Sequence, residues 1–254
     1  MLVDTHCHLD ATEFDGDRDA VVAEALSVGV TRIVVPSVTA AGFMSVEQVV
    51  RQYPVCLPAY GLHPIYAAQH QEQHLQQLEQ VLDQGQAIAV GEIGLDGFDR
   101  QVDFDLQVHW FEAQLAIAAS RHLPVLLHLR HAVDAVIVRL RRSRLRGGIA
   151  HAFNGSLQQA QQLMDLGFCL GFGGAFTWPR ATRLRHLAVT LPLDSIVLET
   201  DAPDMSPVWA RGERNRPAHV LGVARALAEL RGLSIEEVAS MSTANAQRVL
   251  RQYV

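Results

Sequence analysis

The sequence contains no lysine. All 21 of its basic residues are arginine, in a chain of 254 residues that also carries 27 acidic residues. The net charge of −6 disfavours a protein that binds duplex nucleic acid by broad neutralisation of phosphates. A small substrate, or a nucleic-acid end held in a local pocket, is compatible with this charge. The absence of lysine also excludes a carboxylated lysine, the side chain that bridges two metal ions in some enzymes.

Long apolar runs and paired cysteines are scarce as well. The longest uncharged apolar stretches, such as residues 123–127 and 86–91, are strand-sized and too short to span a bilayer. The N-terminus, Met-Leu-Val-Asp-Thr-His, lacks the basic region and apolar run of a signal peptide. We therefore expect a cytoplasmic protein with no membrane association and no obligate protein partner. The scattered cysteines, which we expect to be buried free thiols, are Cys7, Cys56 and Cys169.

Short apolar segments alternate with longer amphipathic stretches along the chain. Strand-like segments cover residues 1–5, 32–37, 55–61, 87–93, 124–128, 148–152, 168–172 and 195–199. Helical periodicity covers residues 18–28, 41–52, 72–84, 102–121, 132–140, 157–166, 180–189, 217–230 and 235–252. This alternation predicts parallel βαβ units, and eight of them match a closed (β/α)8 TIM barrel.

An open doubly wound sheet is the structural alternative. It has no support from a G-x-G-x-x-G sequence after the first strand. No linker rich in Pro, Gly or Ser divides the chain. We therefore expect a single TIM-barrel domain over residues 1–254.

Histidines and carboxylates end the predicted strands. His6 and His8 are two positions apart, so in a strand they share one face and can chelate one cation. The simpler interpretation is a pair of surface histidines. The ends of four later strands carry the further candidates Glu92, His128, His151 and Asp201. Because a barrel gathers its active-site residues at the C-terminal strand ends, we expect all six side chains to meet.

Four histidines and two carboxylates suit zinc best, with manganese, nickel, iron or magnesium as alternatives. The number of ligands indicates two divalent ions. One set around the first ion would be His6, His8, Glu92 and Asp201. The set around the second ion would be Glu92, His128 and His151. Glu92 is the predicted bridge, since no lysine is available for that role.

Two ions close together lower the pKa of a bound water and neutralise charge on an attacked phosphoryl or carbonyl group. Asp201 is the predicted general base, because it can ligate an ion and accept a proton from that water. Glu199, two residues earlier on the same face, either supports the site from behind the ligands or is an ordinary buried carboxylate.

Three further residues are candidates for substrate binding. His63 follows the third strand and could be a ligand, a proton donor or a phosphate contact. Arg130, two residues beyond His128, could bind an anionic group bidentately or form a structural ion pair. Asn154 could line the pocket, or act as a turn or helix-capping residue. The long loop over residues 202–217 carries basic residues that could reach a phosphate.

These motifs together resemble the TatD family of metal-dependent hydrolases. The matching segments are residues 4–10, 61–64, 91–96, 123–130, 151–156 and 199–203, with Asn215 and Asn245 in later expected positions. Residues 202–205, Ala-Pro-Asp-Met, and residues 214–217, Arg-Asn-Arg-Pro, look most like its YjjV-type branch. The resemblance implies a (β/α)8 barrel, the same six metal ligands, and phosphodiester hydrolysis as a deoxyribonuclease acting from a 3′ end. Ile65 and Gly97 depart from the family pattern near the expected substrate cleft.

Three functions are therefore distinguished. The leading hypothesis is a phosphodiesterase that acts on DNA ends or on small phosphodiesters. The second is an amidohydrolase that cleaves a C–N or ester bond, because the same activated water attacks a carbonyl group. The third is a binding protein without catalysis. A barrel this short has few insertions, so we expect a fairly open site.

Overall fold

The computed structural model describes residues 1–99 and 101–250. One sheet contains eight parallel strands in the order β1 to β8. The strands are β1 Leu2–Asp4, β2 Val30–Pro36, β3 Cys56–Tyr60, β4 Ala89–Gly94, β5 Val125–His128, β6 Gly148–Ala150, β7 Phe168–Phe172 and β8 Ile196–Leu198. Sequential order around a ring is that of the TIM barrel, so the open doubly wound alternative is wrong.

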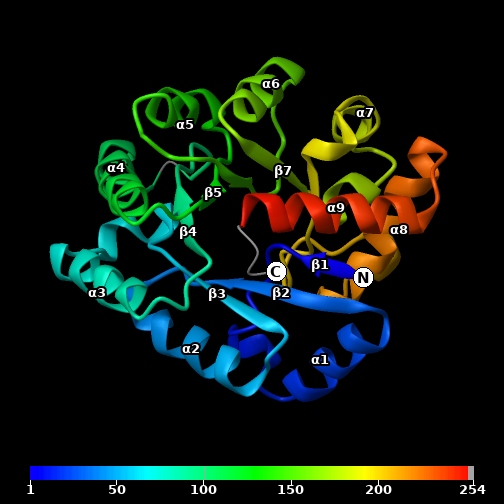
Figure 1. The fold of residues 1–254 in the computed structure, drawn as a ribbon, viewed down its shortest axis with the longest axis horizontal. Helices are drawn as coiled ribbons and strands as arrows, with labels where there is room; N and C mark the ends of the chain where they lie inside the picture. Colours follow the sequence, from blue (N-terminus) through cyan, green and yellow to red (C-terminus); the bar gives the residue numbers. More distant parts are fainter. Residues whose placement is uncertain (100, 251–254) are drawn as a thin grey trace.

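Helices cover the outside of this barrel (Figure 1). They are α1 Arg18–Ser27, α2 Phe43–Gln52, α3 Glu72–Asp83, α4 Phe104–Ser120, α5 Val133–Leu140, α6 Leu157–Asp165, α7 Thr182–Thr190, α8 Val220–Arg231 and α9 Ile235–Val249. Every predicted helical stretch overlaps one of them. The predicted helix over 217–230 begins later, because Pro217–His219 forms a separate 3-10 turn. The end of the stretch predicted for 235–252 lies outside the described residues.

Side-chain capping sets several of the helix starts. Ser156 accepts from the Gln159 backbone N–H while the Gln159 side chain accepts from the Ser156 N–H, and Ser234 and Glu237 form the same reciprocal pair. Such capping satisfies backbone donors that the first helical turn leaves free. Sequence periodicity had already placed both helices, and the caps explain why they begin where they do.

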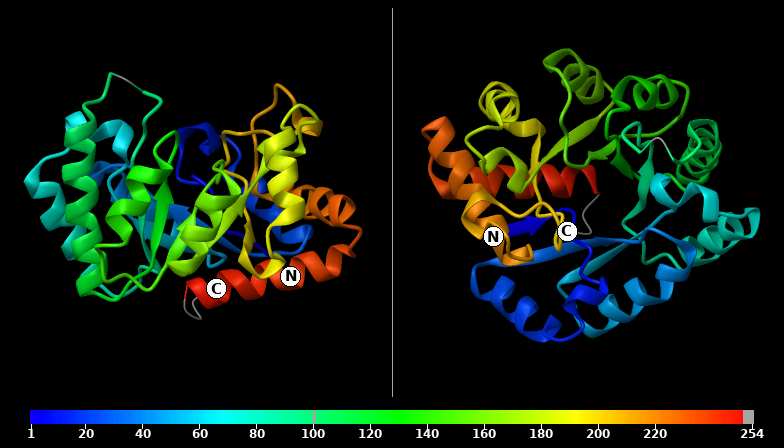
Figure 2. Two further views of the ribbon diagram at one scale, coloured as in Figure 1. Left: turned by 90° about the horizontal axis from the view of Figure 1, so that it is seen from above. Right: turned by 180° about the vertical axis from the view of Figure 1, so that it is seen from behind.

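Inside the barrel, toward the N-terminal ends of the strands, the side chains form an apolar layer separate from the outer core. Each strand contributes to it, with Val3, Val34, Ala59, Ala89, Leu126, Ile149, Cys169 and Val197. Ala246, Val249 and Leu250 of the C-terminal segment complete this cluster. Helix α9 crosses the end of the barrel nearest the viewer in Figure 1 and lies below it in the left view of Figure 2. The N-terminal end of the strands is thus closed, which leaves the C-terminal end for a site.

Among the described residues, no helix is long and apolar enough to cross a membrane. The three cysteines are buried free thiols, as predicted.

Candidate metal centre

Three of the candidate side chains continue the inward-facing side of a barrel strand. His128, His151 and Glu199 each lie two residues after a member of the interior apolar cluster. Those preceding members are Leu126, Ile149 and Val197. Because alternate residues of a strand face the same side, all three polar side chains enter the barrel above its apolar layer.

Glu92 reaches the interior by a different route. The pairing of β4 with β5 is irregular between Val90 and Ile93. The Glu92 N–H donates to the carbonyl of Ser37 on the other side, at 3.1 Å. The Glu92 side chain is buried, with 2% of the residue exposed. A local break in the ladder, rather than strict alternation, therefore places this carboxylate at the centre.

The seam between the first and last strands brings His6, His8 and Asp201 together. The Thr5 N–H donates to the Leu198 carbonyl at 3.0 Å. Beyond the two strands, the Asp201 N–H donates to His6 at 2.8 Å, and the His8 N–H donates to Ala202 at 2.8 Å. These bonds close the barrel, and the same closure sets the three candidate ligands side by side.

Four donor atoms form the first group at this seam. His6 Nε2 lies 3.3 Å from His8 Nε2 and 3.1 Å from Glu92 Oε2. The Asp201 Oδ1 atom lies 3.8 Å from His6 Nε2 and 3.7 Å from His8 Nε2. His8 Nε2 lies 3.5 Å from Glu92 Oε2. Ligand atoms about 2.1 Å from a tetrahedral zinc ion are roughly 3.4 Å apart. These five distances, from 3.1 to 3.8 Å, lie close to that value.

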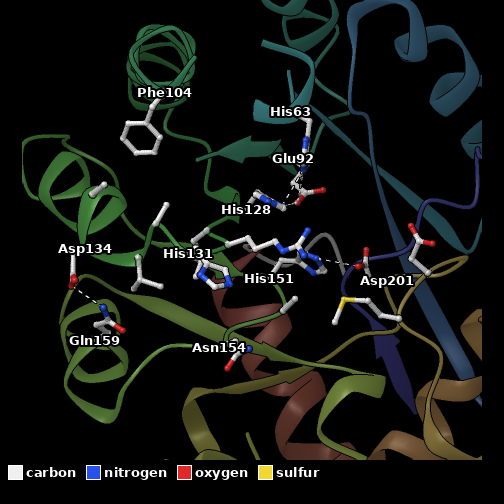
Figure 3. A pocket seen from close by; sticks show the side chains of 18 of the residues that line it. His63, Glu92, Phe104, His128, His131, Asp134, His151, Asn154, Gln159 and Asp201 are labelled. Atoms are coloured by element: carbon white, nitrogen blue, oxygen red, sulfur yellow. Dashed lines mark hydrogen bonds and ion pairs between the residues drawn. The ribbon is translucent and has the colours of Figure 1, made fainter. Parts of the chain in front are cut away.

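A second group uses the other oxygen of Glu92. The Oε1 atom lies 2.9 Å from His128 Nδ1 and 3.4 Å from His63 Nε2. The two histidine nitrogens are 3.0 Å apart. Glu92 thus presents one oxygen to each group, which is the arrangement that a bridging carboxylate needs. Figure 3 shows the labelled side chains of this centre pointing toward one another from separate strands.

The positions of His63 and His151 bear on which ion each would hold. His63, for which a ligand, a proton donor and a phosphate contact were all open, has its Nε2 within the second donor group. The His151 ring stacks on that of His6, with centroids 3.6 Å apart, and its Nε2 lies 3.5 Å from Asp201 Oδ2. Ligand atoms of His151, His6 and Glu92 still lie within 4.8 Å of one another. His151 therefore faces the first group more closely than the second.

Two carboxylates stand behind the histidines. His128 Nε2 lies 2.9 Å from Asp96 Oδ2, and His151 Nδ1 lies 3.1 Å from Glu199 Oε1. Glu199 also accepts from the Ala152 N–H at 2.6 Å. Such outer carboxylates fix the orientation of a ligating imidazole. Sequence reasoning gave Asp96 no role. Its place four residues after Glu92, just past the strand, was the available signal.

The charges of these groups shift one another's pKa values. Burial opposes ionisation of Glu92, but the nearby His63 and His6 hold its pKa well below the usual range. Burial alone would lower the pKa of His8, yet Glu92 and Asp201 outweigh it and raise the value to about 9. Burial lowers the pKa of His63 to about 4 despite the charge of Glu92. Glu92 is therefore ionised and His63 neutral near neutral pH, which are the forms that bind metal.

The centre opens into a cavity of about 1010 Å³. Arg130 and Asn154 both line it, and both are exposed. The Arg130 guanidinium lies 3.7 Å from the centroid of the Phe98 ring. Asn154 Oδ1 accepts from Arg183 Nη2 at 2.6 Å, so a second arginine lines the wall. Arg183 lies inside a predicted helical stretch, and nothing in the sequence pattern marks it as functional.

Comparison with known proteins gives the family. A family model described as TatD related DNase matches residues 3–251. The chain belongs to the TatD family. The uncharacterised metal-dependent hydrolase YjjV of Escherichia coli K12 is 41% identical over 94% of this chain and 93% of its own length. The 3′-5′ ssDNA/RNA exonuclease TatD of Pantoea vagans is 30% identical over 98% of this chain and 99% of its own length.

A solved structure agrees with this assignment. The crystal structure of the Escherichia coli TatD homologue YjjV aligns with a TM-score of 0.94 at 39% identity, over 98% of this chain and 97% of the other. The predicted family, its YjjV-type branch and the barrel are confirmed. This TatD family protein is a metal-dependent hydrolase, so the hypothesis of a binding protein without catalysis is set aside.

Proposed function

We propose that this TatD family protein is a phosphodiesterase that removes nucleotides from the 3′ end of single-stranded nucleic acid with two bound divalent ions. One observation carries the proposal: Glu92 offers Oε2 to one donor group and Oε1 to another. Relatives provide the substrate class, since the Pantoea vagans protein carries the name of a 3′-5′ ssDNA/RNA exonuclease. We also propose that one domain, residues 1–254, holds the whole site.

The donor atoms favour zinc as the native metal. Imidazole and carboxylate suit zinc and its neighbours, and the spacing of the first group matches tetrahedral coordination. His6, His8, Glu92 and Asp201 would hold the first ion. Glu92 and His128 would hold the second, while His151, which the sequence assigned to that second ion, lies nearer the first group. His63 is a further ligand for that second ion, because its Nε2 lies 3.4 Å from Glu92 Oε1 and 3.0 Å from His128 Nδ1.

Two bound divalent ions supply an activated water and neutralise charge on the attacked phosphoryl group. Asp201, whose carboxylate lies in the first donor group, would take a proton from the attacking water. The charges of His151, His6 and His8 outweigh the effect of burial and lower its pKa, so the carboxylate is ionised at neutral pH. Glu199 holds His151 and the Ala152 N–H in place from behind.

The cavity wall would bind the phosphates that flank the reacting one. Arg130 and Arg183 line it on separate elements, and both are exposed. A guanidinium binds phosphate through paired N–H donors. Asn154 orients Arg183 by accepting its Nη2 hydrogen bond. The volume, about 1010 Å³, is at the upper end of the range of about 300–1,000 Å³ typical of small-molecule pockets. A nucleic-acid end fills such a space better than a small diester.

Release of nucleotides from labelled single-stranded DNA by the zinc-loaded protein tests this function. Loss of label from the 3′ end before the 5′ end is expected, and His128→Ala should remove the activity. The same preparation is screened against amides and carboxylic esters, which an amidohydrolase would cleave. Hydrolysis of those substrates with intact DNA would overturn the nuclease proposal.

Metal content tests the shared carboxylate separately. His8→Ala removes a ligand of the first donor group only, so about one ion should stay bound. Glu92→Gln changes a ligand of both groups, so neither ion should be tightly bound. Elemental analysis after dialysis measures both. Equal metal content in the two variants would argue against a bridging Glu92.

A further inference from the structure

Two arginines lie beside Trp178, and a third, Arg183, lines the cavity close by in sequence. The Arg180 and Arg211 guanidinium carbons lie 5.3 Å and 6.0 Å from the centroid of the Trp178 ring. Arg183 lies in α7, three residues after Arg180 along the chain, and lines the cavity wall. All three arginines are exposed, and none forms an ion pair with any residue that the structure describes. We call Trp178, Arg180, Arg183 and Arg211 the Trp178 ledge.

This concentration of positive charge stands out in a chain of net charge −6. The nearby Glu213 does not neutralise it, because its carboxylate lies 3.7 Å from Arg216 instead. Arg214 and Arg216 of the same loop are paired with Asp17 and Glu24. The arginines of the ledge are therefore available to bind an anionic ligand, whereas Arg214 and Arg216 form ion pairs within the protein.

Packing between two loops holds the ledge rigid. At Gly174 a side-chain carbon would lie 2.2 Å from the Met205 carbonyl, so the loop after β7 fits against the loop after β8 only with glycine there. The Val208 N–H donates to Thr177 Oγ1 at 2.9 Å, and Trp178 Nε1 donates to the Ser206 carbonyl at 3.1 Å. The Trp178 ring is thus fixed in a half-buried position before any ligand arrives.

The ledge continues the wall of the catalytic cavity. Arg183 and Met205 line the cavity, and Met205 is joined directly to Ser206, the residue that anchors Trp178. Asn154, labelled in Figure 3, accepts from Arg183 on this wall. In the left view of Figure 2 the orange loop after β8 and the yellow helix α7 lie side by side at the upper rim. A strand leaving the cavity on this side would pass over the ledge.

We propose that the Trp178 ledge binds the single-stranded nucleic acid that extends away from the scissile bond. This inference rests on the proposed function and adds the path of the polymer. Unpaired guanidinium groups bind successive phosphates, and an aromatic ring stacks on a base of any identity. Flexible single strands can follow a curved rim, whereas a duplex needs a broader basic face. The ledge therefore makes the enzyme favour longer single strands over dinucleotides.

Two substrates of different length test the ledge. One is a dinucleotide, which the cavity alone accommodates, and the other is a single strand of about 12 nucleotides. The double variant Arg180→Gln, Arg211→Gln should raise KM for the longer strand about fivefold or more, with kcat unchanged. Its kcat/KM for the dinucleotide should equal that of wild type. The salt dependence of KM for the longer strand should fall by about 1.4 in log–log slope.

Two further variants keep the interpretation clear. Trp178→Ala should also raise KM for the longer strand. Because this variant also loses the hydrogen bond to Ser206 and can alter the loop, the arginine variant is the decisive test of strand binding. The matched control is Arg142→Gln, Arg144→Gln, because both residues are exposed and follow α5 at the opposite end of the barrel. That control should cleave both substrates like wild type.

An unchanged KM for the longer strand in the Arg180, Arg211 variant would overturn the proposal that the ledge binds this strand. If wild type cleaves neither diester, the proposed function fails instead. Fluorescence anisotropy with the labelled strand then still tests whether the ledge binds single-stranded nucleic acid. Weaker binding by the Arg180, Arg211 variant than by its control supports it, and equal binding overturns it.

Discussion

The His128 imidazole lies between two carboxylates, with Nδ1 2.9 Å from Glu92 Oε1 and Nε2 2.9 Å from Asp96 Oδ2. Asp96 is itself fixed, because its Oδ1 accepts from the Phe98 and Asp99 N–H groups at 2.7 and 3.0 Å. Despite the opposing effect of burial, the hydrogen bond to His128 and these two backbone donors hold the pKa of Asp96 well below its usual range. Asp96 therefore remains ionised and orients His128 toward the second donor group.

Asp96→Asn should weaken the binding of one metal ion about 10- to 100-fold while the other ion stays bound. The amide oxygen can still accept from Phe98 and Asp99, so the loop should keep its shape. Competition with a chelator measures the two affinities. Asp99→Asn is the control, since within the described residues that side chain accepts from Gln101 of the same loop and contacts no donor group of the centre. Unchanged affinity for both ions in Asp96→Asn would contradict the role given to Asp96.

Gly171→Ala should destabilise the protein by about 1–3 kcal/mol, as overpacking in a core does. A side-chain carbon at this position would lie 2.2 Å from Glu199 Oε2. Glu199 would have to move away from His151 and Ala152, so activity should fall as well. Urea unfolding gives the change in free energy. Gly16→Ala, where nothing lies within 4 Å of the added carbon, should stay within about 0.5 kcal/mol of wild type.

Metal affinity should rise with pH until the pKa of His8, about 9 in the metal-free protein, is passed. Below that pH the folded protein holds a proton on His8, and a bound ion must displace it. Each displaced proton adds about tenfold in apparent affinity per pH unit. Chelator competition at several pH values gives this slope. His8→Gln should reduce it by about one proton, and an equal slope in both proteins would exclude His8 as a ligand.

Native protein should react with no thiol reagent on the time scale of minutes at mildly alkaline pH. Burial raises the pKa of Cys56 to about 12 and that of Cys7 well above its ordinary value. Burial also raises the pKa of Cys169, although Arg248 opposes the shift. Without a thiolate there is no nucleophile. All three thiols should become titratable with Ellman's reagent after unfolding, and one fast thiol in the native state would show that the barrel opens locally.

Local sequence patterns were sufficient for the barrel and for most of the donor set. Eight strand-like segments separated by helical periodicity predicted the topology, which the structure confirms. The inward direction of His128 and His151 could be predicted from the sequence, because each lies two positions after an apolar residue that faces the barrel interior. Glu92 could be chosen as a bridge from residue types alone, but the irregularity in β4 that turns it inward is not visible in the chain.

The sequence by itself therefore determined the fold class and the chemistry of the centre, since periodicity and residue type are local properties. Only the tertiary structure decided which atoms meet. It brought His63 to Glu92, set Asp96 behind His128, and stacked His151 on His6. It also joined the loops after β7 and β8 around Trp178. These contacts depend on the register between strands and on the packing of distant loops, so they cannot be predicted from the spacing of residues along the chain.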